Sequence, residues 1–148
     1  MTEIPRHQTL TPRQMRRVIL ESPYAGDVAD NVAYARACVR DALLRGEAPL
    51  ASHLLYTQTA VLDDNDARER AHGINAGHAW LHLADAVVVY VDRGISEGMA
   101  AGVRMAEFIG VAIEYRRGII SCIRRAFAGA TRSASSTRPS SNALAATS

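Results

Sequence analysis

The segment that most constrains the fold is a run of five apolar, β-favouring residues at positions 87–91. The run contains no polar alternation, which is typical of a strand covered on both faces in a parallel sheet. Asp92 ends the run, and Gly94, Ser96 and Gly98 follow it as turn and capping residues. The segment therefore predicts a buried strand, a loop, and then a helix whose first free amide groups face a ligand above the strand.

Strand-like and helix-like segments alternate along most of the chain. Strands are predicted at residues 16–21, within 48–55, at 87–91 and at 111–115, and helices at 28–45, from Asp64 or Asp66 to about residue 83, and at 99–108. This alternation predicts an α/β fold, a single-domain three-layer sandwich with a parallel sheet, and right-handed crossovers give the strand order 2-1-3-4. In this order the chain reverses direction between the first and third strands, so a crevice opens above their carboxyl ends.

The predicted domain covers residues 16–116, and the two ends of the chain have a different character. Residues 1–15 are predicted to form a loop because two prolines interrupt them. Residues 117–128 are predicted to form a short amphipathic helix. Residues 129–148 are dominated by Ser, Thr, Ala and Pro, and this composition predicts a disordered tail.

Charge and cysteine content restrict the partners that are expected. All 17 basic residues are arginines, and six of them follow Glu114 without any acidic residue, so the rest of the chain is mildly acidic although the net charge is +2. Phosphate neutralisation needs a positive surface, so nucleic acid is not an expected partner. No apolar run approaches the ~20 residues that span a bilayer, so a membrane is not expected either. Cys38 and Cys122 form no disulfide framework, which favours a cytoplasmic location.

The first candidate ligand-binding loop follows the first predicted strand. Its candidate residues are Ser22, Tyr24, Gly26 and Asp27. Backbone amides and the Ser22 hydroxyl would hold a phosphate or a ribose at this switch point of the sheet, while the Tyr24 ring would stack on a base. The alternative is an ordinary turn in which Asp27 caps the next helix.

The second candidate loop follows the third predicted strand and contains Ser96, Gly98 and Met99. Amide groups at the start of the next helix would hold an anion there, or would only be capped by Ser96. Asp92 would accept hydrogen bonds from ribose hydroxyls, or would cap the turn. Glu97 is either a catalytic carboxylate or a solvated acid favoured by the helix dipole.

Histidines supply two further candidates. His53 and Tyr56 fall near the carboxyl end of the second predicted strand, where they would line the pocket or form a polar pair at the strand end. His78 and His82 are four residues apart on a predicted helix, a spacing that can chelate a metal on one face. No third ligand accompanies them, so neither a metal nor a cofactor is expected, and His78 is expected to be partly buried and hydrogen-bonded.

Several of these segments together resemble the nucleoside 2-deoxyribosyltransferase-like superfamily, and most closely an uncharacterised branch of bacterial and viral genomes. The matching segments are Ser-Pro-Tyr-Ala-Gly at 22–26, His-Leu-Leu-Tyr-Thr at 53–57, Ala-Asp at 84–85 and Gly-Ile-Ser-Glu-Gly-Met at 94–99. The resemblance covers residues 17–116 and implies an α/β domain that binds a nucleoside or a nucleotide. Members of the superfamily often self-associate, which implies a homo-oligomer.

The resemblance also locates the catalytic position. In the characterised enzymes a Glu near the start of the helix after the third strand attacks the anomeric carbon and leaves a covalent glycosyl intermediate. Gly98 and Met99 match the small pair that precedes this Glu, and Gly102 matches the glycine that follows it. The position of the nucleophile then falls on Ala100, which cannot perform this chemistry.

Three functions follow from this reading. The first is a nucleotide- or nucleoside-binding protein without the nucleophile, such as a sensor or a sequestering protein. The alternative is an N-glycosidase or deoxyribosyltransferase acting on (deoxy)nucleosides or their monophosphates, with Glu97 as its carboxylate and Asp92 or Tyr24 assisting. The second alternative is an assembly protein with a vestigial pocket, whose contact face is the apolar side of the predicted C-terminal helix, at Ile119, Ile120, Ile123 and Phe127.

Overall fold

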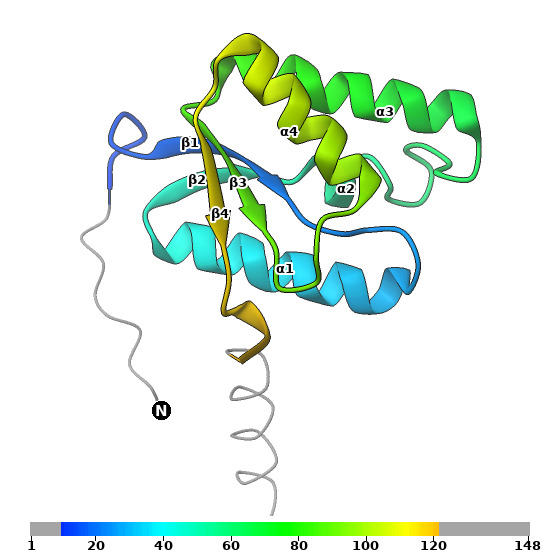
Figure 1. Ribbon diagram of the computed structural model, residues 1–148, viewed down its shortest axis with the longest axis horizontal. Coiled ribbons are helices and arrows are strands. Elements are labelled where there is room, and N and C mark those ends of the chain that lie inside the picture. The colour runs from blue at the N-terminus through cyan, green and yellow to red at the C-terminus, as the bar shows by residue number, and fades with distance from the viewer. Residues whose placement is uncertain (1–9, 122–148) are drawn as a thin grey trace, which may run out of the picture.

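The computed structural model describes residues 10–121 (Figure 1). Four parallel strands form one sheet in the order β2-β1-β3-β4. The strands are β1 (Arg16–Glu21), β2 (Glu47–Leu50), β3 (Ala86–Tyr90) and β4 (Ile113–Arg116). The α/β class, the parallel pairing and the strand order predicted from the sequence are confirmed.

Helices cover both faces of the sheet. They are α1 (Val28–Leu44), the one-turn α2 (Ser52–Leu55), α3 (Ala67–Ala79), the 3₁₀ turn η1 (Leu81–Leu83) and α4 (Glu97–Ile109). Figure 1 shows α1 on one face of the sheet and α3 and α4 on the opposite face. The three layers place the start of α4 beside the loop that follows β1, because β1 and β3 are neighbours in the sheet.

Side-chain alternation divides the core into two parts. The α1 face of the sheet is packed with Val18, Leu20, Val88 and Tyr90, among others, and the α4 face with Ile19, Val87 and Val89. Every residue of β3 is buried, as the unbroken apolar run predicts. Each buried valine or leucine side chain contributes about 1.5–3 kcal/mol, so β3 is the most strongly anchored strand of the sheet.

Helix ends follow the predicted capping residues. The Asp27 side chain accepts a hydrogen bond at the start of α1, Asp66 does so at the start of α3, and Ser96 does so at the start of α4. Gly110 ends α4 with a φ of 78°, in the left-handed region that favours glycine. The sequence therefore determines locally where these helices begin and where α4 ends.

Some predicted boundaries were wrong. The second strand ends at Leu50, and the segment that follows it is the helix α2 rather than a continuation of the strand. The second predicted helix, expected to run to about residue 83, stops at Ala79 and gives way to η1, and the fourth strand begins at Ile113. A contact between helices accompanies the helical conformation of α2. Ser52 of α2 packs closely against Gly77 of α3, and a side chain at position 77 would collide with it. A strand-like sequence pattern does not report such a contact.

A cluster of charged side chains links β1, β2 and β4. Arg116 donates to both carboxylate oxygens of the buried Glu47 at 2.7 Å, and to Glu114 at 2.8 Å. Arg16 contacts both Glu47 and Glu114. Hydrogen bonds from Arg16 and Arg116 lower the pKa of Glu114 to about 2. Because the partners of Arg116 come from the far edge strand as well as from its own, the cluster ties the two edges of the sheet together.

The chain ends lie partly outside the described residues. Residues 1–9 and 122–148, which include the predicted tail and most of the predicted amphipathic helix, are outside them. Residues 119–121 are helical, and Ile119 is buried in the core on the α1 face. Its side chain is therefore not part of a free contact face, whereas Ile123 and Phe127 lie outside the described residues.

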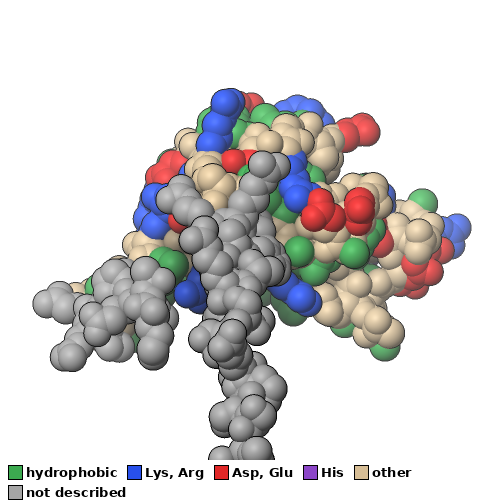
Figure 2. All heavy atoms as spheres, turned by 90° about the horizontal axis from the view of Figure 1, so that it is seen from below, with side chains coloured by type: hydrophobic (Ala, Val, Ile, Leu, Met, Phe, Trp, Pro, Cys, Tyr) green, Lys and Arg blue, Asp and Glu red, His purple; other side chains and the backbone are tan. Residues whose placement is uncertain are grey.

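The outer surface on the side of α1 carries acidic and basic side chains interspersed with hydrophobic ones (Figure 2). Across residues 10–121, the structure contains no helix with the length and hydrophobicity needed to cross a membrane.

Candidate functional site

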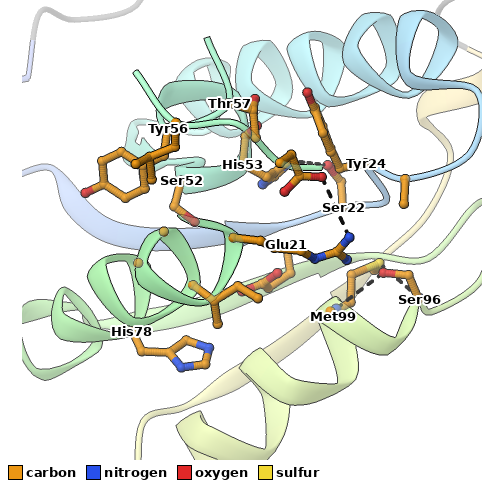
Figure 3. A pocket seen from close by; sticks show the side chains of 18 of the residues that line it. Glu21, Ser22, Tyr24, Ser52, His53, Tyr56, Thr57, His78, Ser96 and Met99 are labelled. Carbon is orange, nitrogen blue, oxygen red and sulfur yellow. Dashed lines mark hydrogen bonds and ion pairs between the residues drawn. The ribbon is translucent and has the colours of Figure 1, made fainter. Parts of the chain in front are cut away.

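A cavity of about 310 Å³ opens where β1 ends (Figure 3). Its walls come from the loop after β1, from α2, from the inner face of α3 and from the first turn of α4. The cavity thus lies at the carboxyl edge of the sheet, beside the point where the chain reverses direction. Eight predicted site residues line it: Ser22, Tyr24, His53, Tyr56, Ser96, Glu97, Gly98 and Met99.

Three predicted ligand-binding residues lie outside the cavity lining. Gly26 forms the turn after β1 with a φ of 96°, and Asp27 accepts a hydrogen bond from the backbone of Asp30 as the cap of α1. Asp92 accepts hydrogen bonds from the Tyr34 hydroxyl at 2.9 Å and from the backbone N–H of Gly118 at 2.7 Å. The carboxylate of Asp92 therefore joins β3 to α1 and to the segment after β4, and the structure does not bring it to the ligand-facing side.

A serine and a histidine form a hydrogen-bonded pair in the cavity wall. Ser22 Oγ lies 2.8 Å from His53 Nε2, and Ser22 is buried. Burial lowers the pKa of His53 to about 4, so its imidazole is neutral near pH 7. The ring of Tyr24 meets the imidazole edge-to-face, with 6.4 Å between the ring centroids. His53 comes from α2 rather than from the end of a strand, which is why the unexpected helix matters for the site.

Glu21, the last residue of β1, also lines the cavity, and sequence reasoning missed it. Figure 3 shows its side chain reaching from β1 into the space beside α3 and α4. Burial raises the pKa of this carboxyl to about 8. The sequence signal was a single acidic residue at the end of an otherwise buried strand, directly before Ser22, and it was interpreted only as the end of the strand.

Glycine in α4 makes room for this carboxyl. Gly102 is buried, and an ideal Cβ built on it would lie 2.9 Å from Glu21 Cδ. A larger residue at position 102 would displace the carboxyl. Among the described residues, no hydrogen bond or ion pair reaches the Glu21 carboxyl, and burial alone raises its pKa.

The other charged groups of the lining are mostly acidic. Asp64, Glu69 and Glu97 line the cavity together with one cation, Arg70, whose Nη1 lies 3.8 Å from Asp64 Oδ2. The excess of negative charge in the lining repels a ligand with several negative charges. The guanidinium of Arg70 is available for a single phosphate.

His78 also lines the cavity, and partial burial lowers its pKa. His82, the other member of the predicted pair, is exposed beyond the end of α3. Within residues 10–121, no group of three His, Cys, Asp or Glu side chains is placed to hold a metal ion.

A family model described as a domain of unknown function (DUF7768) matches residues 16–116 of the chain. The chain belongs to the DUF7768 family. The match runs from the first residue of β1 to the last residue of β4, so the cavity lies entirely inside the DUF7768 domain. No curated protein matches the sequence.

The two loops of the DUF7768 domain are held together by residues that sequence reasoning did not select. The buried Asn31 of α1 donates to the carbonyl oxygens of Tyr24 and Ala25 at 3.1 and 2.9 Å. Arg93, in the loop after β3, donates to Asn31 Oδ1 at 3.0 Å and pairs with Asp30 at 2.6 Å. These contacts fix the loop after β1 relative to the loop after β3. Contacts within the protein are therefore sufficient to hold Tyr24 and Ser96 at the same cavity.

The start of α4 supplies the remaining wall of the site. Ser96 Oγ accepts a hydrogen bond from the backbone N–H of Met99 at 3.3 Å, and the Met99 side chain is buried. The Ser96 hydroxyl is therefore already used as a cap. The groups that remain for a ligand are the backbone amides of Glu97 and Gly98, in the first turn of the helix.

Proposed function

We propose that this DUF7768 domain binds a nucleoside or a nucleoside monophosphate in the cavity at the end of β1. The observation that carries the proposal is the composition of one cavity wall. Two aromatic rings, Tyr24 and Tyr56, lie in the same lining as the hydrogen-bonded Ser22–His53 pair and the half-buried carboxyl of Glu21. Flat apolar surfaces suit a base, and fixed polar groups suit the edge of a base or the hydroxyls of a sugar.

The volume and charge of the cavity narrow the ligand class. About 310 Å³ is at the lower end of the range for small-molecule sites, which suits a nucleoside better than a dinucleotide. Three acidic side chains against one arginine disfavour a di- or triphosphate. The proposed ligand therefore carries no phosphate or a single one, and the guanidinium of Arg70 is the group that would bind this phosphate.

The position of the aromatic rings supports stacking. The Tyr56 hydroxyl accepts a hydrogen bond from Trp80 Nε1 at 3.0 Å, which fixes the ring of Tyr56 against α3. The Tyr24 ring rests edge-on against His53 and remains partly exposed. Stacking of a base on an aromatic ring is worth about 1–3 kcal/mol, so loss of one ring should be measurable in the dissociation constant.

Calorimetry with ribo- and deoxynucleosides and their mono- and triphosphates tests the proposal. We expect micromolar or tighter binding of at least one nucleoside or monophosphate, weaker binding of its triphosphate, and intact ligand by chromatography afterwards. Tyr24→Ala should weaken binding about tenfold or more, whereas the matched change Tyr115→Ala, on the exposed side of β4, should leave it unchanged. Absence of binding across the whole panel would refute the proposal.

A second candidate function is hydrolysis of the N-glycosidic bond in the same cavity. Two carboxyl groups in different environments favour it: Glu21 is half-buried with a raised pKa of about 8 and keeps its proton near pH 7, whereas Glu97 is exposed at the start of α4. Water would attack the anomeric carbon and lose a proton to Glu97. The bond to the base would break, and the departing nitrogen would keep the electron pair and take the proton of Glu21.

Incubation of nucleosides and monophosphates with the protein, followed by chromatography for free base, separates the two candidates. Hydrolysis predicts free base and free sugar in equal amounts and loss of this activity in Glu97→Gln. Glu107→Gln, on the outer part of α4, is the matched control. Wild-type release of base that is unchanged in Glu97→Gln would remove Glu97 from the mechanism.

A further inference from the structure

The carboxyl of Glu21 lies in the cavity wall, and no described side chain pairs with it. Ser22 is paired with His53, Ser96 with the amide of Met99, and Arg70 lies beside Asp64. No described residue hydrogen-bonds to the Glu21 carboxyl or forms an ion pair with it. Its side chain is half-buried in the cavity wall, and its carboxyl oxygens remain open to the cavity, so an acceptor atom of a bound ligand can pair with them.

The surroundings of Glu21 are shaped to hold the group in place. Its side chain extends from the end of β1, a strand paired on both sides, and is therefore fixed at its base. Gly102 of α4 leaves space where any other residue would meet the carboxyl. The carboxyl thus lies at the boundary between the core and the cavity.

We propose that the Glu21 carboxyl donates a hydrogen bond to an acceptor atom of the bound nucleoside, a ring nitrogen or a carbonyl oxygen of the base. The proposal rests on the proposed function, because it assigns a recognition role within the same cavity. A carboxylic acid that keeps its proton is a donor, and it turns into a repelling acceptor when the proton leaves. Ligand affinity therefore depends on the proton of Glu21, and the site selects acceptor edges.

Other ionisable groups face the same cavity and must be separated from Glu21 in any test. They are His53 from α2, Asp64 from the loop before α3, Glu69, Arg70 and His78 from α3, Glu97 from α4, and the phenols of Tyr24 and Tyr56. The two histidines have lowered pKa values, so they are neutral above pH 7 and do not change charge there. The raised pKa of Glu21, about 8, places its change of charge in the alkaline range instead.

Comparison of wild type with Glu21→Gln isolates this one proton. The amide of glutamine remains a donor at every pH and has nearly the same shape. We measure the dissociation constant of each nucleoside at pH 7 and pH 9 for both proteins by calorimetry, with Glu107→Gln as the matched control. Titration of the nucleoside itself and of the other groups affects both proteins alike, so the ratio of the wild-type to the Glu21→Gln constant reports Glu21 alone.

The ratio of the two dissociation constants should rise about tenfold between pH 7 and pH 9, because wild type loses its proton over this interval and the variant has none to lose. Glu107→Gln should follow wild type. If a nucleoside binds and the ratio stays constant, the role of Glu21 is refuted while the nucleoside-binding function stands. If no nucleoside binds either protein, the proposed function fails and this proposal fails with it.

A second measurement does not need the variant. The carboxyl carbon of Glu21 in uniformly ¹³C-labelled wild type reports its own titration by NMR, with and without saturating nucleoside. A hydrogen bond donated to the ligand stabilises the protonated form, so nucleoside should raise the pKa of Glu21. A pKa that falls when nucleoside binds would overturn the proposal even if Glu21→Gln did not fold.

Discussion

Replacement of Glu21 by glutamine should stabilise the protein, and by an amount that grows with pH. The pKa of Glu21 rises from the ordinary 4.5 to about 8 on folding, because burial disfavours the charged carboxylate. Below pH 4.5 the folded and unfolded chains both hold the proton. Between pH 4.5 and pH 8 the unfolded chain releases it while the folded chain keeps it, so wild type loses about 1.4 kcal/mol of unfolding free energy per pH unit.

The size of this destabilisation of wild type follows from the pH interval between 4.5 and 8. At pH 5 the cost is below about 1 kcal/mol, and at pH 8 it reaches about 4 kcal/mol, whereas glutamine does not titrate. The stabilisation in Glu21→Gln should therefore be about 3 kcal/mol larger at pH 8 than at pH 5. Urea unfolding at pH 5, 6.5 and 8 measures it, with the single tryptophan, Trp80, as the fluorescent probe.

The control for this experiment is Glu107→Gln, which removes one exposed carboxylate from the same helix that packs against Glu21. It should change the unfolding free energy by less than about 0.5 kcal/mol at each pH. A difference between wild type and Glu21→Gln that is the same at pH 5 and pH 8 would show that Glu21 titrates as an ordinary surface carboxyl. The reasoning about its buried position would then be refuted.

Two further predictions concern the glycine beside this carboxyl and the charged cluster on the sheet. Gly102→Ala should weaken nucleoside binding about tenfold, because the added methyl group displaces the Glu21 carboxyl. The free energy of unfolding in urea should change by less than about 1 kcal/mol, because the higher helix propensity of alanine offsets the displacement. Unchanged affinity would contradict the contact between Gly102 and Glu21. Arg116→Ala should cost about 3 kcal/mol of unfolding free energy, since Glu47 stays buried without its bidentate partner; a loss below about 1 kcal/mol would contradict this. Glu114, with its pKa lowered to about 2, stabilises wild type above pH 4.5, and its advantage over Glu114→Gln in urea should disappear as the pH falls from 4.5 to 2.

Local patterns in the sequence predict the scaffold well. The five apolar residues that begin at Val87 correspond to the fully buried strand β3 and its end, and the strand order follows from the alternation of elements and from crossover handedness. Asp27 and Ser96 cap the helices that they were expected to begin, and of the two candidates Asp64 and Asp66 it is Asp66 that caps α3. Capping and burial depend on residues close in sequence or on a strong periodicity, so they are visible without coordinates.

Features that depend on contacts between distant residues were not predictable. The helix α2 exists where Ser52 meets Gly77, and the lowered pKa of His53 follows from burial in that place. Glu21 is separated from Gly102 by 81 positions, and neither residue by itself indicates that the carboxyl is enclosed. Asp92 was expected either to bind ribose hydroxyls or to cap the turn after its strand, but its carboxylate accepts a hydrogen bond from the Tyr34 hydroxyl of α1.

The sequence therefore predicts the loops of the candidate site but not the contacts that hold them in place. Turn and capping signals marked the loops that contain Tyr24 and Ser96, and both loops line the cavity. The contacts that fix those loops, from Asn31 and Arg93, use side chains whose sequence context is that of an ordinary helix and an ordinary loop. The sequence signal is an asparagine on the apolar face of a helix in its first turns, where burial requires hydrogen-bond partners for the amide.

Two-dimensional ¹H–¹⁵N NMR of the labelled protein, titrated with a panel of nucleosides and their monophosphates, tests the central claim most directly. The account predicts that at least one of them shifts amide signals that cluster at residues 21–25, 52–57 and 96–99, around the cavity. Unshifted spectra with every compound, or shifts confined to the outer surface around Leu43 and Phe108, would contradict it.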